Sequence, residues 1–155
     1  MNGRKLSLVA LFVLILGAMA FPTLAAEKTV TVTLTETDIN NSYRVTNPAR
    51  RSITNEHVDL QPGQVVITAT FTAPKTSPID VSVTLVPTVS NGRVTWTVLA
   101  ASANGQPASA DVLAQINASI SSSWRNYWKN KHPGYVTALT ISDTDITWTK
   151  VYGSK

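Results

Sequence analysis

The chain has 155 residues, of which 43% are hydrophobic and 14% are charged, with no cysteine and a formal net charge of +4. A chain of this length supports one domain, and its charged fraction, well below the usual value of about 25%, argues against a charged disordered chain. The lack of cysteine excludes disulfides, thiol nucleophiles, thiolate zinc sites and lipidated cysteines. The fold must therefore be stabilised by ordinary burial of apolar side chains.

The N-terminal segment has the layout of a secretory signal peptide. Two basic residues precede an apolar run over residues 6–20, and small residues follow it. An uncleaved anchor is the alternative, but an apolar run of about 15 residues is short for a bilayer span. We expect residues 1–25 to be removed and residues 26–155 to form a single domain that is secreted or extracytoplasmic, in the cell envelope. Cleavage removes Arg4 and Lys5, and the charge that remains is too scattered for a nucleic-acid partner.

The first half of the expected domain reads as strands joined by turns, with one short helix. Residues 28–34 alternate Val or Leu with Thr, which predicts a half-buried strand. The Thr35 hydroxyl and the carboxylate three residues later have the spacing of a capping box, which predicts a short helix over about residues 36–45. Two alternating runs, 53–60 and 64–73, flank a Pro-Gly turn and predict a hairpin.

The second half adds another hairpin, one long helix and two closing strands. The Asn-Gly pair at 91–92 is the strongest short-range hairpin signal in the chain. A helix from about 109 to 130 follows, capped by Ser109 or Asp111, because apolar residues recur every four positions along it. The expected strands of this half lie over residues 79–85, 94–100, 135–142 and 145–151.

This order of elements predicts an α+β fold. Only one helix is long enough to cover the apolar face of the strands. We therefore expect a strongly curved antiparallel sheet wrapped around one long amphipathic helix, with a short N-terminal helix beside it. The other face of the sheet is rich in Thr, which favours strands and tolerates water.

No catalytic template is present in the sequence. The two histidines, His57 and His132, lie on different predicted elements, and neither is near a serine in a nucleophile elbow. His57 and Asp59 share a strand face and suggest at most a partial metal site, for which a solvated strand pair is the alternative. Asp143 and Asp145 lack the glycine and glutamate of an EF-hand loop. The sequence therefore predicts a protein that is not an enzyme and that holds no metal or cofactor.

Aromatic and basic residues gather at the end of the predicted long helix. Arg125, Trp128, Lys129 and Lys131 lie there, and aromatic rings followed by cations suit the boundary between lipid and water. The alternative is that the rings belong to the core while the cations solvate the helix end and complement its dipole. On the first interpretation these four residues form a membrane-surface site that makes transient contact with a bilayer.

Several segments resemble the small bacterial members of the tubular lipid-binding superfamily, which includes the bactericidal/permeability-increasing protein fold. They are LTETDIN, VDLQPGQVVITATF, VSVTLVPTVSNGRVTWTV, the NGQP step into a helix containing LAQIN, and VTALTISDTDITWT. The likeness covers residues 28–152 and lies in the order of the elements. It implies a curved sheet around a long helix, with an apolar groove between them for acyl chains. The chain departs from relatives that carry a lipobox cysteine or two units in tandem.

A groove of this kind would be lined by one face of the helix and the inner face of the strands. Our candidates for the lining are Phe71, Val81, Val83, Val98, Ile116, Ile120 and Trp124. The sequence thus predicts a protein that binds lipid or another apolar small molecule by burial of methylenes, at roughly 0.8 kcal/mol each. An extracellular structural or protein-interaction module with a fully packed core is the alternative.

Overall fold

A computed structural model describes residues 27–45, 52–131 and 134–152, so the expected signal peptide lies outside the described residues. Its paired strands are antiparallel, and strands and helices occupy separate layers, which confirms the predicted α+β class. In chain order the elements are β1 (Lys28–Thr35), α1 (Glu36–Ser42), β2 (Ser52–Gln61), β3 (Gln64–Thr72), β4 (Ile79–Ser90), β5 (Arg93–Ala103), β6 (Gln106–Pro107), α2 (Ala110–Ile116), η1 (Asn117–Ser121), α3 (Ser122–Lys131), β7 (Tyr135–Ile141) and β8 (Asp145–Tyr152).

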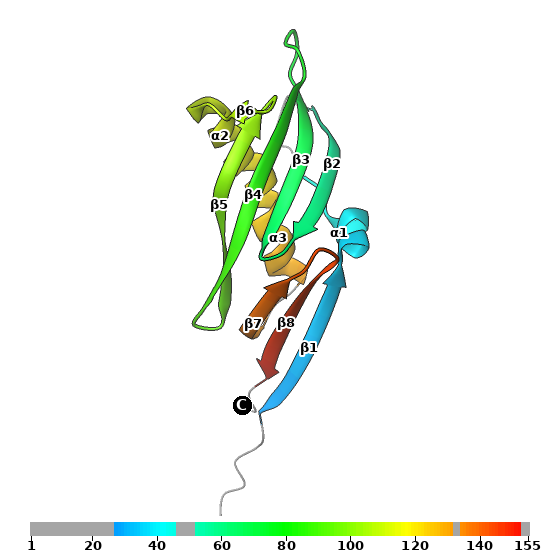
Figure 1. Cartoon of the computed structure of the whole chain (residues 1–155), viewed down its shortest axis with the longest axis vertical. Helices are drawn as coiled ribbons and strands as arrows, with labels where there is room; N and C mark the ends of the chain where they lie inside the picture. Colours follow the sequence, from blue (N-terminus) through cyan, green and yellow to red (C-terminus); the bar gives the residue numbers. More distant parts are fainter. Residues whose placement is uncertain (1–26, 46–51, 132–133, 153–155) are drawn as a thin grey trace, which may run out of the picture.

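The described strands form two sheets. One has five strands in the order β2-β3-β4-β5-β6, and the other has three in the order β1-β8-β7. Figure 1 shows the five-stranded sheet above the three-stranded one, with the helical stretch from α2 to α3 behind the larger sheet. The prediction of one strongly curved sheet is therefore wrong. The reason is that β1 pairs along its whole length with β8, from Lys28 opposite Tyr152 to Thr35 opposite Asp145, instead of joining β2.

The local signals of the sequence are found where they were predicted. Thr35 is the N-cap of α1, and its Oγ1 accepts a hydrogen bond from the Asp38 amide at 3.1 Å. Asn91 and Gly92 have φ angles of 49° and 73°, as a tight hairpin turn requires. Helix α1 ends earlier than predicted because Tyr43 has an extended backbone and turns into the core.

The predicted helix between residues 109 and 130 is present as α2, η1 and α3, which follow one another without a gap. Ser109 is its N-cap rather than Asp111, since the Ser109 hydroxyl accepts from the Val112 amide. An apolar stripe that recurs every four residues would drift around a regular α-helix, which has 3.6 residues per turn. The π-helical segment η1 is wider and absorbs the extra residue. Ile116, Ile120 and Trp124 are consequently all fully buried.

One hydrophobic cluster joins both sheets and the helical stretch. All four tryptophans of the chain belong to it and form a continuous series of ring contacts. Trp96 of β5 contacts Trp124 and Trp128, with ring centroids 5.2 and 5.4 Å apart, and Trp128 contacts Trp148 of β8 at 5.1 Å. Edge-to-face contacts of this kind add to the stabilisation that burial provides. The helical stretch therefore connects the two sheets through its aromatic end.

Candidate functional site

The seven predicted groove residues meet in the interface between the helical stretch and the five-stranded sheet. Six of them are buried and Val98 is partly buried against them; the buried ones are Phe71, Val81, Val83, Ile116, Ile120 and Trp124. Val83, Ile116, Ile120 and Trp124 each have 0% exposure. The structure thus brings the predicted residues together, and their side chains pack against one another and against the rest of the core.

Tyr43 also belongs to this interface. The sequence predicts this residue to lie in the short N-terminal helix expected over residues 36–45. Its ring meets Trp124 edge-to-face at 5.5 Å, and its Oη donates to the carbonyl of Ile120 at 3.0 Å. Burial raises the pKa of the Tyr43 hydroxyl well above its ordinary value of 10, and the negative charge of Glu56 adds to the shift. Tyr43 is therefore a neutral hydrogen-bond donor that holds the π-helical segment in place.

A pocket of about 670 Å³ opens where α3 meets the β4–β5 turn and β7. Trp96 and Trp128 supply aromatic rings, while Arg93, Arg125 and Lys129 supply positive charge. We call these five residues the cation–aromatic pocket. None of the residues that line it is acidic. The site is therefore suited to a ligand that is both apolar and negatively charged.

The cationic side chains of this pocket have N–H donors that form no hydrogen bond with the described residues. Arg125 is oriented by one bond, from its Nε to the carbonyl oxygen of Trp96 at 3.2 Å. The same guanidinium keeps its two terminal amino groups without a partner among the described residues. The side chains of Arg93 and Lys129 are exposed and likewise make no hydrogen bond or ion pair within residues 27–45, 52–131 and 134–152.

Three of the four predicted membrane-surface residues, Arg125, Trp128 and Lys129, line this pocket. The Trp128 side chain is only 5% exposed, so it belongs to the core as well as to the pocket wall. Lys131 ends α3, and its side chain lies outside the described part of the structure. Sequence reasoning missed the contribution of Arg93 and Trp96, because β5 lies about thirty residues before α3 in the chain. The only local signal was a cation directly after the Asn-Gly turn.

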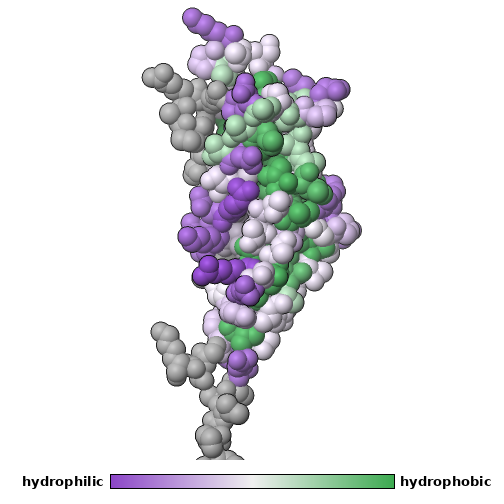
Figure 2. All heavy atoms as spheres, turned by 90° about the vertical axis from the view of Figure 1, so that its left-hand side faces the viewer, coloured by the Kyte–Doolittle hydropathy of each residue, from purple (hydrophilic) through white to green (hydrophobic). Residues whose placement is uncertain are grey.

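Apolar surface continues beyond the pocket on the same side of the molecule. Figure 2, which views the side where β5 lies, shows hydrophobic residues gathered in a strip next to hydrophilic ones. Leu99 of β5 is 64% exposed, and it has no partner on β4 because a β-bulge interrupts the pairing there. Apolar and charged surfaces therefore lie side by side on this flank.

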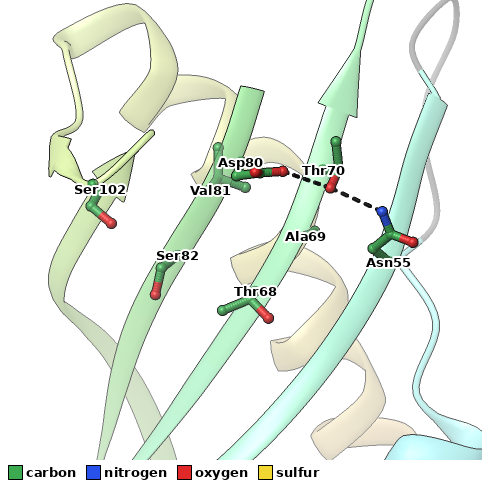
Figure 3. Close-up of a pocket in the computed structure, with 9 residues that line it drawn as sticks. Asn55, Thr68, Ala69, Thr70, Asp80, Val81, Ser82 and Ser102 are labelled. Atoms are coloured by element: carbon green, nitrogen blue, oxygen red, sulfur yellow. Dashed lines mark hydrogen bonds between the residues drawn. The ribbon is translucent and has the colours of Figure 1, made fainter. Parts of the chain in front are cut away.

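A second hollow, of about 410 Å³, lies on the face of the five-stranded sheet away from the helix (Figure 3). Asn55 donates to the Thr70 hydroxyl at 3.2 Å, and that hydroxyl donates to Asp80 at 2.8 Å. Thr68 and Ser82 extend the polar lining (Figure 3). The bonds among Asn55, Thr70 and Asp80 form a short polar network across three neighbouring strands.

The described residues bring no further ligands to the metal-binding positions considered from the sequence. In the part of the chain that the structure describes, no three His, Asp or Glu side chains lie close enough to hold a metal ion. Asp59 accepts from the side-chain Nε2 of Gln61 at 2.7 Å, and Asp145 accepts from the Thr144 and Thr147 hydroxyls. His57 is exposed on β2, and His132 lies outside the described residues.

Comparison with family models, with curated proteins and with solved structures found no match. Among the described residues, no helix is both long enough and apolar enough to cross a bilayer. The function must therefore be inferred from the geometry of the chain itself.

Proposed function

We propose that the protein binds lipid, with an anionic headgroup held in the cation–aromatic pocket. The observation that carries the proposal is the composition of this pocket, in which three cations and two indole rings meet without a carboxylate. Guanidinium groups bind phosphate and carboxylate oxygens in paired hydrogen bonds, and Arg125 has two amino groups left for such bonds. The apolar part of the ligand lies against the rings of Trp96 and Trp128.

The proposed position differs from the groove that the sequence suggested. An acyl chain between helix and sheet would have to displace Val83, Ile120 and Trp124, which are fully buried. Protein interiors are packed nearly as densely as organic crystals, so such displacement is costly. The pocket beside α3 is already open and needs no such change.

The proposal includes export of the chain to the cell envelope or the medium, and a relationship to the tubular lipid-binding superfamily. Its support is the signal-peptide pattern of residues 1–25 and the order of the elements in the rest of the chain. The division of the strands into two sheets is a departure from the fold that this resemblance implies.

A second candidate function is a protein-interaction module without a ligand. The dense packing of the helix–sheet interface favours it, because no cavity there is needed for such a role. The two functions differ in whether the purified protein takes up lipid.

The test is binding of the protein to vesicles of phosphatidylglycerol and of phosphatidylcholine, together with native mass spectrometry after purification without detergent. We expect binding to the anionic vesicles that weakens as salt rises. The double variant Arg125→Gln/Lys129→Gln should weaken that binding about tenfold or more, because charge-assisted bonds are lost.

The matched control is Lys28→Gln/Lys75→Gln, which removes the same charge from two exposed positions away from the pocket. It should retain most of the binding. Equal losses in the two double variants would show that net charge alone attracts the vesicles. No binding to either lipid, with no lipid in the mass spectrum, would favour the interaction module.

A further inference from the structure

The two sheets have four edges, and the described residues close three of them. An open strand edge presents unpaired backbone N–H and C=O groups and invites pairing with another strand. For this reason proteins cover, bend or charge their edges. An edge that has none of these protections can pair with a strand of a partner molecule.

Helix α1 closes the edge formed by β2. The Asn40 side chain acts as a substitute strand: its Nδ2 donates to the Val58 carbonyl, and its Oδ1 accepts from the Val58 amide, both at 2.8 Å. Glu36 accepts from the Leu60 amide at 2.7 Å. A register shift after Thr54 also bends the strand.

The edges at β5 and β7 are closed in other ways. On β5, the carbonyl of Trp96 accepts from Arg125, a bulge lies at Leu99, and β6 pairs with the last residues. On β7, the Val136 amide donates to the carbonyl of Gly92 at 2.9 Å, and a register shift follows directly.

The edge formed by β1 has none of these devices. The strand pairs with β8 over eight residues without a register shift, and it contains no Pro or Gly. Within the described residues, no other segment forms a backbone hydrogen bond with Lys28–Thr35. Figure 1 shows this strand along the outer side of the smaller sheet. It is a long, regular edge whose one charged residue, Lys28, lies at its end.

We propose that the partner of this edge is a second copy of the chain, paired β1 to β1 in antiparallel fashion about a two-fold axis. The strand KTVTVTLT is complementary to itself, because Thr occupies every second position and Val or Leu the positions between. A two-fold axis through any residue of the strand therefore places Thr opposite Thr and Val or Leu opposite Val or Leu.

An axis through Val32, for example, puts Thr31 opposite Thr33 of the other copy and Val30 opposite its Leu34. The aliphatic residues of β1 are half-buried in one copy, and pairing would bury more of each. No charged residue lies near the centre of the interface, so the two-fold axis brings no like charges together there. The result is a continuous six-stranded sheet with the order β7-β8-β1-β1-β8-β7.

The absence of cysteine makes a direct test available, because each single-cysteine variant carries one thiol. In an antiparallel pair, the two residues on the axis have Cα atoms about 4.5–5.5 Å apart, within the range that a disulfide spans. We therefore expect single cysteines placed in turn at residues 30–34 to give a maximum of disulfide-linked dimer at one position. Thr95→Cys, an exposed threonine on the closed β5 edge, is the control.

Sedimentation equilibrium supplies the second measurement. The unaltered protein should show a concentration-dependent equilibrium between monomer and dimer. Thr31→Lys should raise the dissociation constant of the dimer about tenfold or more, because it brings two like charges close together where the two β1 strands pair. Thr95→Lys is the control and should leave the dissociation constant unchanged. Thermal unfolding would verify that both variants fold.

Two outcomes would overturn the proposal. One is a protein that stays monomeric over the whole concentration range. The other is a dimer in which no cysteine in β1 cross-links faster than the Thr95→Cys control.

Discussion

The two sheets of this protein have similar strands but different surroundings. The five-stranded sheet has its apolar face covered by the helical stretch, and side chains of α1 and α3 bond to its edges. The three-stranded sheet shares the core through Ile146 and Trp148, but the outer edge of β1 has no cover among the described residues. The difference between the sheets indicates that polar groups from a neighbouring element, together with bulges in the strands, close an edge.

The two sheets are nevertheless energetically connected. Trp128 lies between Trp96 of the larger sheet and Trp148 of the smaller one, and the backbone bond from Val136 to Gly92 spans the same junction. We therefore expect the sheets to unfold together. Substitutions in the shared core and at the junction test this connection between the sheets. A substitution at the closed β2 edge tests the difference in edge closure.

The largest effect is expected from Trp124→Ala, in helix α3, which packs on the five-stranded sheet. The side chain is fully buried and contacts the rings of Tyr43, Trp96 and Tyr127, so its removal should lower the free energy of unfolding by about 3–5 kcal/mol. Urea unfolding followed by circular dichroism measures this loss. Tyr152→Ala, at an exposed position on β8, is the control and should cost about 1 kcal/mol or less. Two separate transitions in the variant would contradict the shared core.

The second effect concerns edge closure by α1. Asn40→Ala leaves both backbone groups of Val58 without their partner, which should cost about 1–3 kcal/mol in the free energy of unfolding. Asn41→Ala is matched to it, because Asn41 is the exposed neighbour on the same helix. Equal losses in the two variants would mean that helix propensity, and not closure of the edge, accounts for the result. Hydrogen exchange at Val58 should rise only in Asn40→Ala.

The smallest effect is expected at the junction between the sheets. Gly92 and Gly105 have φ angles of 73° and 76°, so alanine is strained by a similar amount at both, roughly 1 kcal/mol. A Cβ at Gly92 would also overlap the ring of Tyr135, whereas a Cβ at Gly105 meets nothing within 4 Å. Gly92→Ala should therefore lower the melting temperature more than Gly105→Ala. If Tyr135→Ala in the same chain fails to remove this excess, the overlap is not its cause.

Much of the secondary structure could be predicted from the sequence because the responsible signals are local. The Asn-Gly turn, the Thr35 and Ser109 caps and the alternation of Thr with Val each act within a few residues. The burial of six of the seven candidate groove residues, and the partial burial of Val98, followed from the same periodicity. The π-helical segment is also reflected in the sequence, because the apolar residues of the long helix recur every four residues instead of every 3.6.

Other features depend on contacts between distant parts of the chain. The pairing of β1 with β8 joins residues more than a hundred positions apart and divides the strands into two sheets. Likewise, the meeting of Arg93 and Trp96 with Arg125 and Lys129 depends on how α3 lies against the first residues of β5.

The sequence by itself determined the α+β class, the approximate helix and strand positions, and most of the side chains that are buried, because caps, turns and periodicity act over short distances. Only the tertiary structure decided which edge stays open and where cations surround an aromatic pocket. Periodicity says which face of a strand is buried, but it contains no information about which strand lies beside it.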